Sequence, residues 1–193
     1  MSGDGARLEA LYSSTNSEHY TPPDVLNLVA AVLGGIDLDP CADPGCRVPA
    51  AAHYTAELDG LRRPWAGRVF MNPPYGRRIG AWVDRLVEAH AAGAVPEAIA
   101  LVPARVDSAW WRRLASSCSL VLFWAGRLRF LDSDGRPQSP APFPSALVYL
   151  GRNGARFVEV MGGRGQVWQR VEAAGLTGQP LPAGMVKAWA EVA

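Results

Sequence analysis

The string Asn72-Pro73-Pro74-Tyr75 is the most specific motif in this sequence, and its residue types suit chemistry on the amine of a nucleobase. Such an amine is a poor nucleophile because its lone pair is delocalised into the ring. The Asn72 side-chain oxygen and the Pro73 carbonyl can accept both amine hydrogens, and Tyr75 can stack on a base taken out of its helix. With the amine held in this way, methyl transfer to it would be a matter of alignment and electrostatics and not of covalent catalysis. The alternative is a stiff turn whose tyrosine plugs the core.

This string lies between a predicted strand and a predicted helix. Residues 68–71 form an apolar strand, and the two prolines end it because proline removes ladder donors. A helix is expected over residues 79–92. Ligands of open α/β sheets bind beyond the carboxyl ends of strands, so the loop that begins at Asn72 is in the right place for a site.

The remaining elements alternate between helix and strand. Apolar spacing predicts a helix that begins at Pro23 with Thr21 as its N-cap and ends at Gly34-Gly35, and Asp107 can cap a helix that runs to residue 114. This alternation predicts an α/β fold with a mostly parallel sheet. Strands are expected at residues 36–39, 98–102, 120–123, 127–131, 145–150 and 157–160, and short helices at residues 167–174 and 185–192.

Length and composition favour a single packed domain. The chain has 193 residues, of which 49% are hydrophobic and 19% charged, so a core is expected. A net charge of +1 excludes the long basic footprint of a histone-like nucleic-acid binder. We expect a flexible arm over residues 1–17, a catalytic domain over residues 18–162 and a helical extension over residues 163–193.

The cellular compartment is predicted from the lack of a membrane-spanning segment and of a signal peptide in the sequence. No apolar stretch approaches the length of a membrane-spanning helix, and the N-terminus lacks the apolar core of a signal peptide. Three cysteines without a disulfide-like spacing fit a reducing environment. We therefore expect a cytoplasmic protein that does not bind a membrane.

Several motifs in order resemble one known family, the phage-type DNA N6-adenine methyltransferases, which are the Dam-like enzymes of bacteriophages and prophages. The resemblance spans about residues 20–150. The motifs that carry it are Tyr20-Thr21-Pro22-Pro23, Asp37-Leu38-Asp39-Pro40-Cys41-Ala42, Gly67-Arg68-Val69-Phe70-Met71-Asn72-Pro73-Pro74-Tyr75-Gly76, Gly126-Arg127-Leu128-Arg129-Phe130 and Ala141-Pro142-Phe143-Pro144-Ser145-Ala146.

The resemblance implies a Rossmann-like methyltransferase domain with S-adenosylmethionine as the methyl donor and adenine in double-stranded DNA as the acceptor. It also implies a phage or prophage gene expressed in a bacterial cytoplasm. By position, the catalytic loop would be Asn72, Pro73, Pro74 and Tyr75. The cofactor site would begin at Asp39, Pro40, Cys41 and Ala42, and Tyr20, Thr21 and Pro22 would touch the methionine end of the cofactor.

Spacing predicts a reduced sheet around the cofactor site. Residues 40–67 are too few for two strands with their crossover helices, because each crossover takes about a dozen residues or more. The acidic residue that would bind the cofactor ribose has only Glu57 and Asp59 as candidates, and both can equally be solvated. Asp39 can accept a hydrogen bond from the cofactor amino group, or it can simply cap the turn that follows it.

Other motifs are less informative. The sequence contains no glycine-rich phosphate loop, which disfavours a dehydrogenase or an ATPase. Cys41, Cys46 and His53 lack an obvious fourth ligand, so we expect no metal. Cys118 is expected in the core, and His19 and His90 are expected to face solvent. The oligomeric state stays open.

Residues 127–144 are the best candidates for DNA contact, because long loops with arginine and aromatic residues beside a site often bind. Arg129 and Arg136 can contact the phosphate groups of DNA. Phe130 or Phe143 can form a wall of the base pocket opposite Tyr75, although burial in the core is an equal alternative. Just after the catalytic loop, Arg77 and Arg78 can grip the DNA backbone or merely solvate the start of a helix.

Two alternatives to a DNA methyltransferase stay open. Loops like Asn72 to Tyr75 also occur in methyltransferases that act on RNA bases or on a protein glutamine. The chain could also be a DNA-binding module that keeps the fold but has lost turnover, which the shortened cofactor region motivates.

Overall fold

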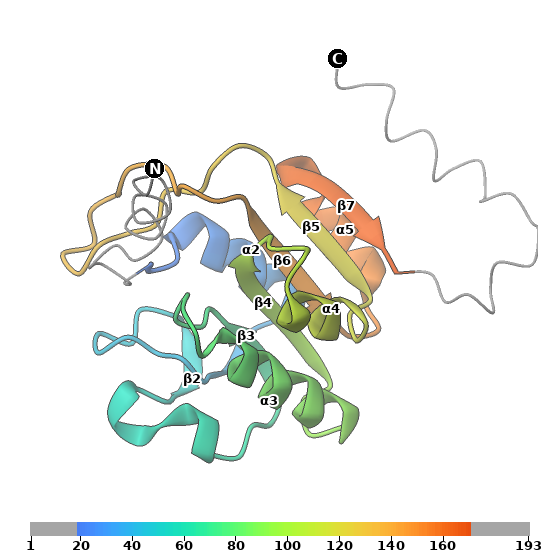
Figure 1. Cartoon of the computed structure of the whole chain (residues 1–193), viewed down its shortest axis with the longest axis horizontal. Helices are drawn as coiled ribbons and strands as arrows, with labels where there is room; N and C mark the ends of the chain where they lie inside the picture. Colours follow the sequence, from blue (N-terminus) through green and yellow to red (C-terminus); the bar gives the residue numbers. More distant parts are fainter. Residues whose placement is uncertain (1–18, 171–193) are drawn as a thin grey trace, which may run out of the picture.

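The computed structural model describes residues 19–170, and within them a seven-stranded sheet has the order β2-β1-β3-β4-β6-β5-β7 (Figure 1). The strands are β1 (Ile36–Asp39), β2 (Ala50–His53), β3 (Arg68–Met71), β4 (Glu97–Pro103), β5 (Leu120–Trp124), β6 (Ser145–Leu150) and β7 (Gly165–Gln169). The helices are α2 (Pro23–Leu33), α3 (Ile79–Ala91), α4 (Ala109–Ala115) and α5 (Gly154–Met161), with 3-10 turns η1 (Ala56–Leu58), η2 (Gly60–Arg62) and η3 (Gly162–Arg164).

The sheet confirms the predicted α/β class and its parallel part. Strands β2, β1, β3 and β4 are all parallel, whereas β6 is antiparallel to both β4 and β5, and β7 is antiparallel to β5. The carboxyl ends of β1 and β3 therefore meet at one edge, where ligands of such sheets bind. Between these two strands the chain forms a single strand, β2, followed by η1 and η2 in place of an α-helix. The sheet is thus reduced where the spacing predicted it.

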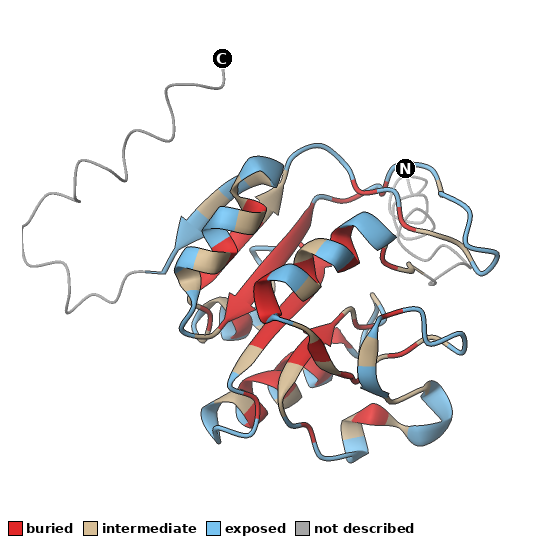
Figure 2. Ribbon diagram, turned by 180° about the vertical axis from the view of Figure 1, so that it is seen from behind, coloured by how far each residue is buried: buried red, intermediate tan, exposed pale blue. Residues whose placement is uncertain are grey.

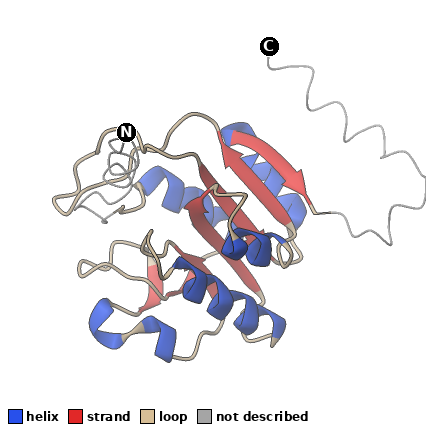
Figure 3. Cartoon of the chain, viewed as in Figure 1, coloured by secondary structure: helices blue, strands red, loops and turns tan. Residues whose placement is uncertain are grey.

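Helices cover both faces of the sheet, α3 and α4 on one side and α2 and α5 on the other (Figures 1 and 3). Along β4, Ala98, Ala100 and Val102 pack toward α3 and α4, while Ile99 and Leu101 pack toward α2 and α5. This two-sided burial explains the continuous apolar run of the strand. The buried residues gather along the middle of the sheet (Figure 2).

Two helix starts differ from the prediction. Pro22 occupies the N-cap position of α2, and the Thr21 hydroxyl accepts a hydrogen bond from Asn72 instead of capping the helix. In α4 the cap is Ser108, whose Oγ accepts from the Trp111 backbone N–H at 3.3 Å, and not Asp107. The end of α2 is as predicted, because Gly34 takes a left-handed conformation with φ of 69°.

Three predicted elements in the second half of the chain are wrong. Residues 127–131 form a loop in which only Leu131 makes β-bridges, one to Tyr20 and one to Pro137. The period-two pattern therefore reflects side chains that are buried in alternation, without a partner strand. Residues 157–160 belong to α5, because Asn153 caps a helix that buries Phe157 and Met161 four residues apart. Residues 167–169, expected in a helix, form part of β7 because they pair with the free edge of β5.

The outer segments are only partly described. The predicted arm over residues 1–17 and the predicted helix over residues 185–192 lie outside the described residues, as does most of the extension over residues 163–193. Its first part contributes strand β7 to the sheet. None of the helices within residues 19–170 is long and apolar enough to cross a membrane.

Candidate active site

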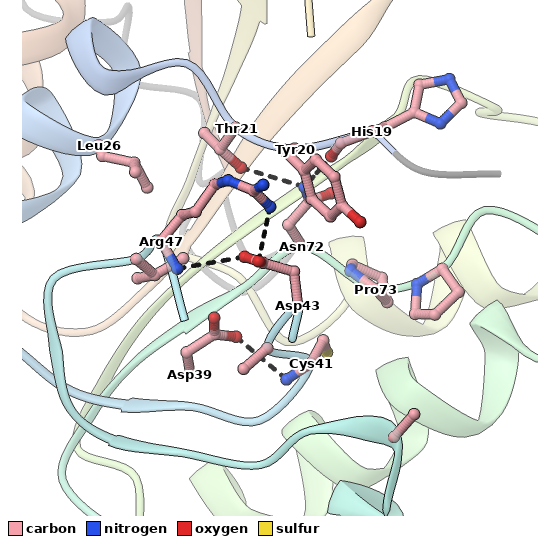
Figure 4. A pocket seen from close by; sticks show the side chains of 14 residues that line it. His19, Tyr20, Thr21, Leu26, Asp39, Cys41, Asp43, Arg47, Asn72 and Pro73 are labelled. Carbon is pink, nitrogen blue, oxygen red and sulfur yellow. Dashed lines mark hydrogen bonds and ion pairs between the residues drawn. The ribbon is translucent and has the colours of Figure 1, made fainter. Parts of the chain in front are cut away.

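A cavity of about 330 Å³ opens at the carboxyl ends of β1 and β3 (Figure 4). It brings together three segments that are far apart in the sequence: the chain before α2, the loop after β1 and the loop after β3. Eight of its lining residues were predicted as site residues: Tyr20, Thr21, Asp39, Cys41, Ala42, Asn72, Pro73 and Pro74. The others are His19, Leu26, Asp43, Arg47, Val48 and Ala56.

The Asn72 amide has one end fixed and the other unpartnered. Its Nδ2 donates to the His19 carbonyl at 2.7 Å and to the Thr21 hydroxyl at 3.0 Å. Because the His19 carbonyl can only accept, these contacts determine which way round the amide lies. Its Oδ1 atom is buried and has no hydrogen-bond partner within residues 19–170. An unmet buried acceptor is costly, so this oxygen is available for an N–H group of a ligand.

Asp39 is a buried carboxyl group in the wall of the cavity. Its side chain accepts a hydrogen bond from the Cys41 backbone N–H at 3.0 Å, so the predicted turn cap is present. Burial raises the pKa of Asp39 to about 7, an effect that the Cys41 hydrogen bond and the charge of His53 only partly oppose. A cationic or N–H group entering the cavity would stabilise the charged carboxylate.

Arg47 and Asp43 are site residues that sequence reasoning missed. The Arg47 Nη1 atom lies 2.7 Å from Asp43 Oδ1, and the guanidinium carbon lies 4.4 Å from the centre of the Tyr20 ring (Figure 4). Arg47 also donates through Nη2 to the Ser133 carbonyl. The four-residue spacing of Asp43 and Arg47 was the available signal, but the contacts with Tyr20 and Ser133 leave no pattern in the sequence.

Tyr75 lies beside the cavity in a cluster of four rings. Its ring centre is 5.2 Å from that of His19, 6.0 Å from that of Phe130 and 5.4 Å from that of Phe143. The Tyr75 hydroxyl donates to the Leu101 carbonyl at 3.3 Å, and burial raises the pKa of this phenol well above its usual value. Phe130 and Phe143 are both buried and both contact the Tyr75 ring, so they pack in the core and also lie next to the predicted catalytic loop.

Neither His19 nor His90 faces solvent as predicted. His19 is half-buried and its ring packs against Tyr75, Phe130 and Phe143. His90 is also half-buried, and its Nδ1 atom lies 2.7 Å from the Val95 carbonyl at the end of α3. His19 is partly buried because three aromatic rings pack against it, and His90 because its ring reaches a backbone carbonyl.

A family model described as DNA N-6-adenine-methyltransferase (Dam) matches residues 11–161. The chain belongs to this family. The match contains all three segments of the cavity and every strand except β7. A search of curated proteins found no match.

Three residues predicted for the cofactor site of this Dam-family protein do not line the cavity. Pro22 starts α2, where its carbonyl accepts from the Val25 and Leu26 backbone N–H groups. Pro40 is buried, and its carbonyl lies 2.0 Å from where a Cβ on Gly60 would stand, so glycine is required there. Asp59 forms an ion pair with Arg62, in which Asp59 Oδ2 lies 3.2 Å from Arg62 Nε.

Neither of the two residues predicted as candidates for an acidic ribose contact, Glu57 and Asp59, lines the cavity. Glu57 is exposed and also lies outside the lining, whereas its neighbour Ala56 belongs to it. The lining contains two carboxyl groups, those of Asp39 and Asp43. Asp43 is already held by Arg47 and by the Gly45 backbone N–H, which donates to it at 2.7 Å.

The arginines predicted to contact DNA lie on the surface of the protein. Arg77 and Arg78 are exposed directly after the loop that begins at Asn72. Arg129 is exposed and its Nη1 reaches the Gln138 carbonyl at 3.5 Å, while exposed Arg136 pairs with Asp134 at 3.2 Å. Because Leu131 pairs with Tyr20, the loop that carries Arg129 and Arg136 is attached to the cavity wall.

The described residues contain no group of three side chains suited to a metal ion. Of the possible zinc ligands, Cys46 is exposed, and the Nε2 atom of His53 lies 2.8 Å from the Val48 carbonyl. Cys41 lines the cavity, and burial raises the pKa of its thiol well above the usual value. Cys118 is buried in the core as predicted.

Proposed function

We propose that this Dam-family protein is a DNA adenine N6-methyltransferase that uses S-adenosylmethionine and acts on an adenine turned out of double-stranded DNA. The observation that carries the proposal is the buried, unpartnered Oδ1 atom of Asn72, held in a cavity that also contains the Asp39 carboxyl group. A turn that only stiffened the chain would not require an amide oxygen to stay unmet.

Asn72 and Pro73 act on the amine of the acceptor base. The amide is already oriented, because its Nδ2 is held by the His19 carbonyl and the Thr21 hydroxyl. Oδ1 can then accept one amine hydrogen and the Pro73 carbonyl the other. These bonds draw the nitrogen lone pair out of conjugation with the ring and aim it at the incoming methyl group. Such preorganised acceptors need no rearrangement during the reaction.

The cavity fits a donor of the S-adenosylmethionine kind. Its volume of about 330 Å³ is within the range of small-molecule sites, roughly 300 to 1,000 Å³. Asp39 would hold the amino group of the cofactor and remain charged beside it, and Tyr20 and Thr21 would border the same end. When bound, the cofactor supplies a methyl group on a positively charged sulfur, which makes that methyl group electrophilic.

The acceptor is proposed to stack at the four-ring cluster and to be held by surface arginines. Tyr75 follows Asn72 on the same loop, so a base whose amine meets Asn72 comes next to the Tyr75 ring. Phe130 and Phe143 pack against that ring in edge-to-face contacts. The exposed side chains of Arg77, Arg78, Arg129 and Arg136 offer contacts to phosphate.

A direct assay tests this proposal. The purified protein is incubated with labelled S-adenosylmethionine and, in parallel, with an adenine-containing DNA duplex, an RNA of the same sequence and a glutamine-containing protein. We expect label in the DNA only, recovered as N6-methyladenine after digestion. Label in the RNA or the protein would replace the proposed acceptor. DNA binding with no transfer and no calorimetric heat from the cofactor would identify a binding module and overturn the proposal.

A further inference from the structure

The Arg47 guanidinium joins three segments that are distant in the sequence. It pairs with Asp43 in the loop after β1, it lies over the ring of Tyr20 before α2, and it donates to the carbonyl of Ser133. Asp43 also accepts from the Arg47 backbone N–H at 3.2 Å, so both ends of the arginine are held. The Arg47 and Asp43 side chains are only 32% and 7% exposed.

The segment around Ser133 is a compact turn. Asp132 Oδ1 accepts from the backbone N–H groups of Asp134 at 2.9 Å and Arg136 at 2.8 Å, and the Gly135 N–H donates to the Asp132 carbonyl at 3.0 Å. This turn is the tip of the loop that carries Arg129 and Arg136. It is fastened to the cavity wall by the backbone pairing of Leu131 with Tyr20 and by Arg47.

We propose that Arg47 is a positioning residue that couples the cofactor cavity to the DNA-contacting loop, so that a filled cavity tightens DNA binding. This inference rests on the proposed function, since it takes S-adenosylmethionine as the occupant and DNA as the partner of the loop. Coupling of this kind is reciprocal, so DNA also tightens cofactor binding.

The donors of Arg47 explain how an occupant is sensed. A guanidinium has five N–H groups, and the bonds to Asp43 and Ser133 use two of them. Others are available to the carboxylate of the cofactor's amino-acid end. An occupant also excludes water from the cavity, and lower local polarity strengthens the bonds that Arg47 already makes. The turn at Ser133 is then held more firmly than in the empty protein.

The chemistry specifies arginine at this position. A planar guanidinium can stack on Tyr20 while it donates in its own plane to Asp43 and Ser133. A lysine ammonium keeps the charge but is a compact point donor on a flexible stem. Arg47→Lys therefore preserves electrostatic attraction to DNA and removes the planar three-way contact.

Arg156 provides a matched control. It pairs with Glu159 at 3.0 Å and donates from Nε to the Ala31 carbonyl at 3.1 Å, so it too combines an ion pair with a bond to a distant carbonyl. Its side chain is 40% exposed, similar to that of Arg47. It lies on α5 and does not line the cavity. Arg156→Ala removes the same charge without touching the proposed link.

The experiment measures the dissociation constant of a fluorescent adenine-containing duplex with and without saturating S-adenosylhomocysteine, which cannot donate a methyl group. For the native protein and Arg156→Ala we expect the ligand to tighten DNA binding by about 5-fold or more, the lower end of typical coupling. For Arg47→Ala and Arg47→Lys we expect a ratio close to one. Thermal unfolding confirms that each variant is folded.

The outcomes separate the two proposals. A native ratio in a folded Arg47→Ala or Arg47→Lys protein would overturn the coupling role, and so would a native protein that methylates DNA with a ratio of one. Complete loss of S-adenosylhomocysteine binding in both Arg47 variants would also overturn it, because Arg47 would then serve the cofactor alone. A native protein that does not methylate DNA would refute the proposed function instead.

Discussion

Strand β1 carries two aspartates, two residues apart, whose carboxyl groups have opposite properties. The Asp37 carboxylate accepts three hydrogen bonds from Arg68: from Nη2 at 2.7 Å, from Nε at 2.9 Å and from the backbone N–H at 2.8 Å. These bonds lower the pKa of Asp37 to about 2. Asp39 is buried with a hydrogen bond to the Cys41 N–H, and its burial raises its pKa to about 7.

The difference distinguishes a structural acid, Asp37, from the acid that we propose to be the binding acid, Asp39. Asp37 and Arg68 satisfy each other and join β1 to β3. Asp39 lies at the end of β1 in the cavity wall, where part of its hydrogen-bonding capacity is left for a ligand. The Oδ1 atom of Asn72, which is buried without a hydrogen-bond partner among the described residues, shares this property. Native proteins rarely leave such groups unmet unless a ligand uses them.

The largest effect is expected from Asn72→Ala. It removes the unpartnered Oδ1 atom, so the acceptor amine loses a preorganised contact. By analogy with the loss of one oxyanion-hole hydrogen bond, turnover should fall by about 10² to 10³-fold. Single-turnover methylation of a DNA duplex measures the change, and full activity of this variant would defeat the proposed role of the side chain.

Asn153→Ala is the matched control for that experiment. Asn153 caps α5 and accepts from the Arg156 backbone N–H at 3.4 Å, on a helix that contributes no lining residue. Loss of an N-cap destabilises a protein by about 1 kcal/mol. We expect urea unfolding to show this loss while turnover stays native. The two asparagines thus separate stability from catalysis.

Much of the site was predictable because local chemistry marks it. The Asn72 motif follows a strand, and Asp39 ends another, so parallel pairing brings them to one edge. Arg47 was missed because its bond to Ser133 spans 86 residues and ends on a backbone carbonyl, which any residue type would supply. Asp59 was favoured by its position in the sequence, but in the structure it pairs with Arg62.

The fold was predictable where one pattern dominates. The apolar run of β4 indicated two-sided burial, and residues 98–102 are buried on both sides. The second half of the chain was harder. Phe157 to Val160 have the β-branched and aromatic character of a strand, yet the Asn153 cap and the burial of Phe157 and Met161 favour a helix. Strand β7 depends on the free edge of β5, which no local pattern reveals.

Asp39→Asn should produce the second largest effect. It removes the charge that would hold the cofactor amino group, and a hydrogen bond to a charged group contributes about 1.5–3 kcal/mol. Affinity for S-adenosylhomocysteine should therefore fall by roughly 10 to 150-fold, as measured by calorimetry. Unchanged affinity would exclude Asp39 from the cofactor site. The free energy of unfolding at pH 7 should rise, because a buried charge is removed.

The pH dependence of stability sharpens the comparison between the two acids. The pKa of Asp39 is raised, so between about pH 4 and 7 the folded state binds more protons than the unfolded state. The contribution of Asp39 therefore becomes less favourable as pH rises through this window, by up to about 1.4 kcal/mol per pH unit. Asp37 has a lowered pKa, so its contribution is present above about pH 4 and is lost as pH falls toward 2.

Urea unfolding at pH 4.5, 5.5, 6.5 and 7.5 tests this expectation. The stability of Asp39→Asn relative to the native protein should rise from pH 4.5 to 6.5 and level off toward pH 7.5, because the variant lacks the group whose ionisation is unfavourable. Parallel curves would mean that the Asp39 carboxyl group titrates normally. Saturating S-adenosylhomocysteine should reduce the slope of the native protein, since its amino group stabilises the charged carboxylate.

The smallest effect is expected from Asp37→Asn. The Asp37 and Arg68 side chains are 39% and 36% exposed, so solvent screens their attraction, and the loss at pH 7 should be about 1 kcal/mol at most. Arg68 also keeps its bonds to the Leu33 and Gly34 carbonyls, which limits the damage. Cofactor affinity and turnover should remain native, because Asp37 does not line the cavity. If Asp37→Asn weakened S-adenosylhomocysteine binding as much as Asp39→Asn, the division of β1 into a structural acid and a binding acid would be wrong.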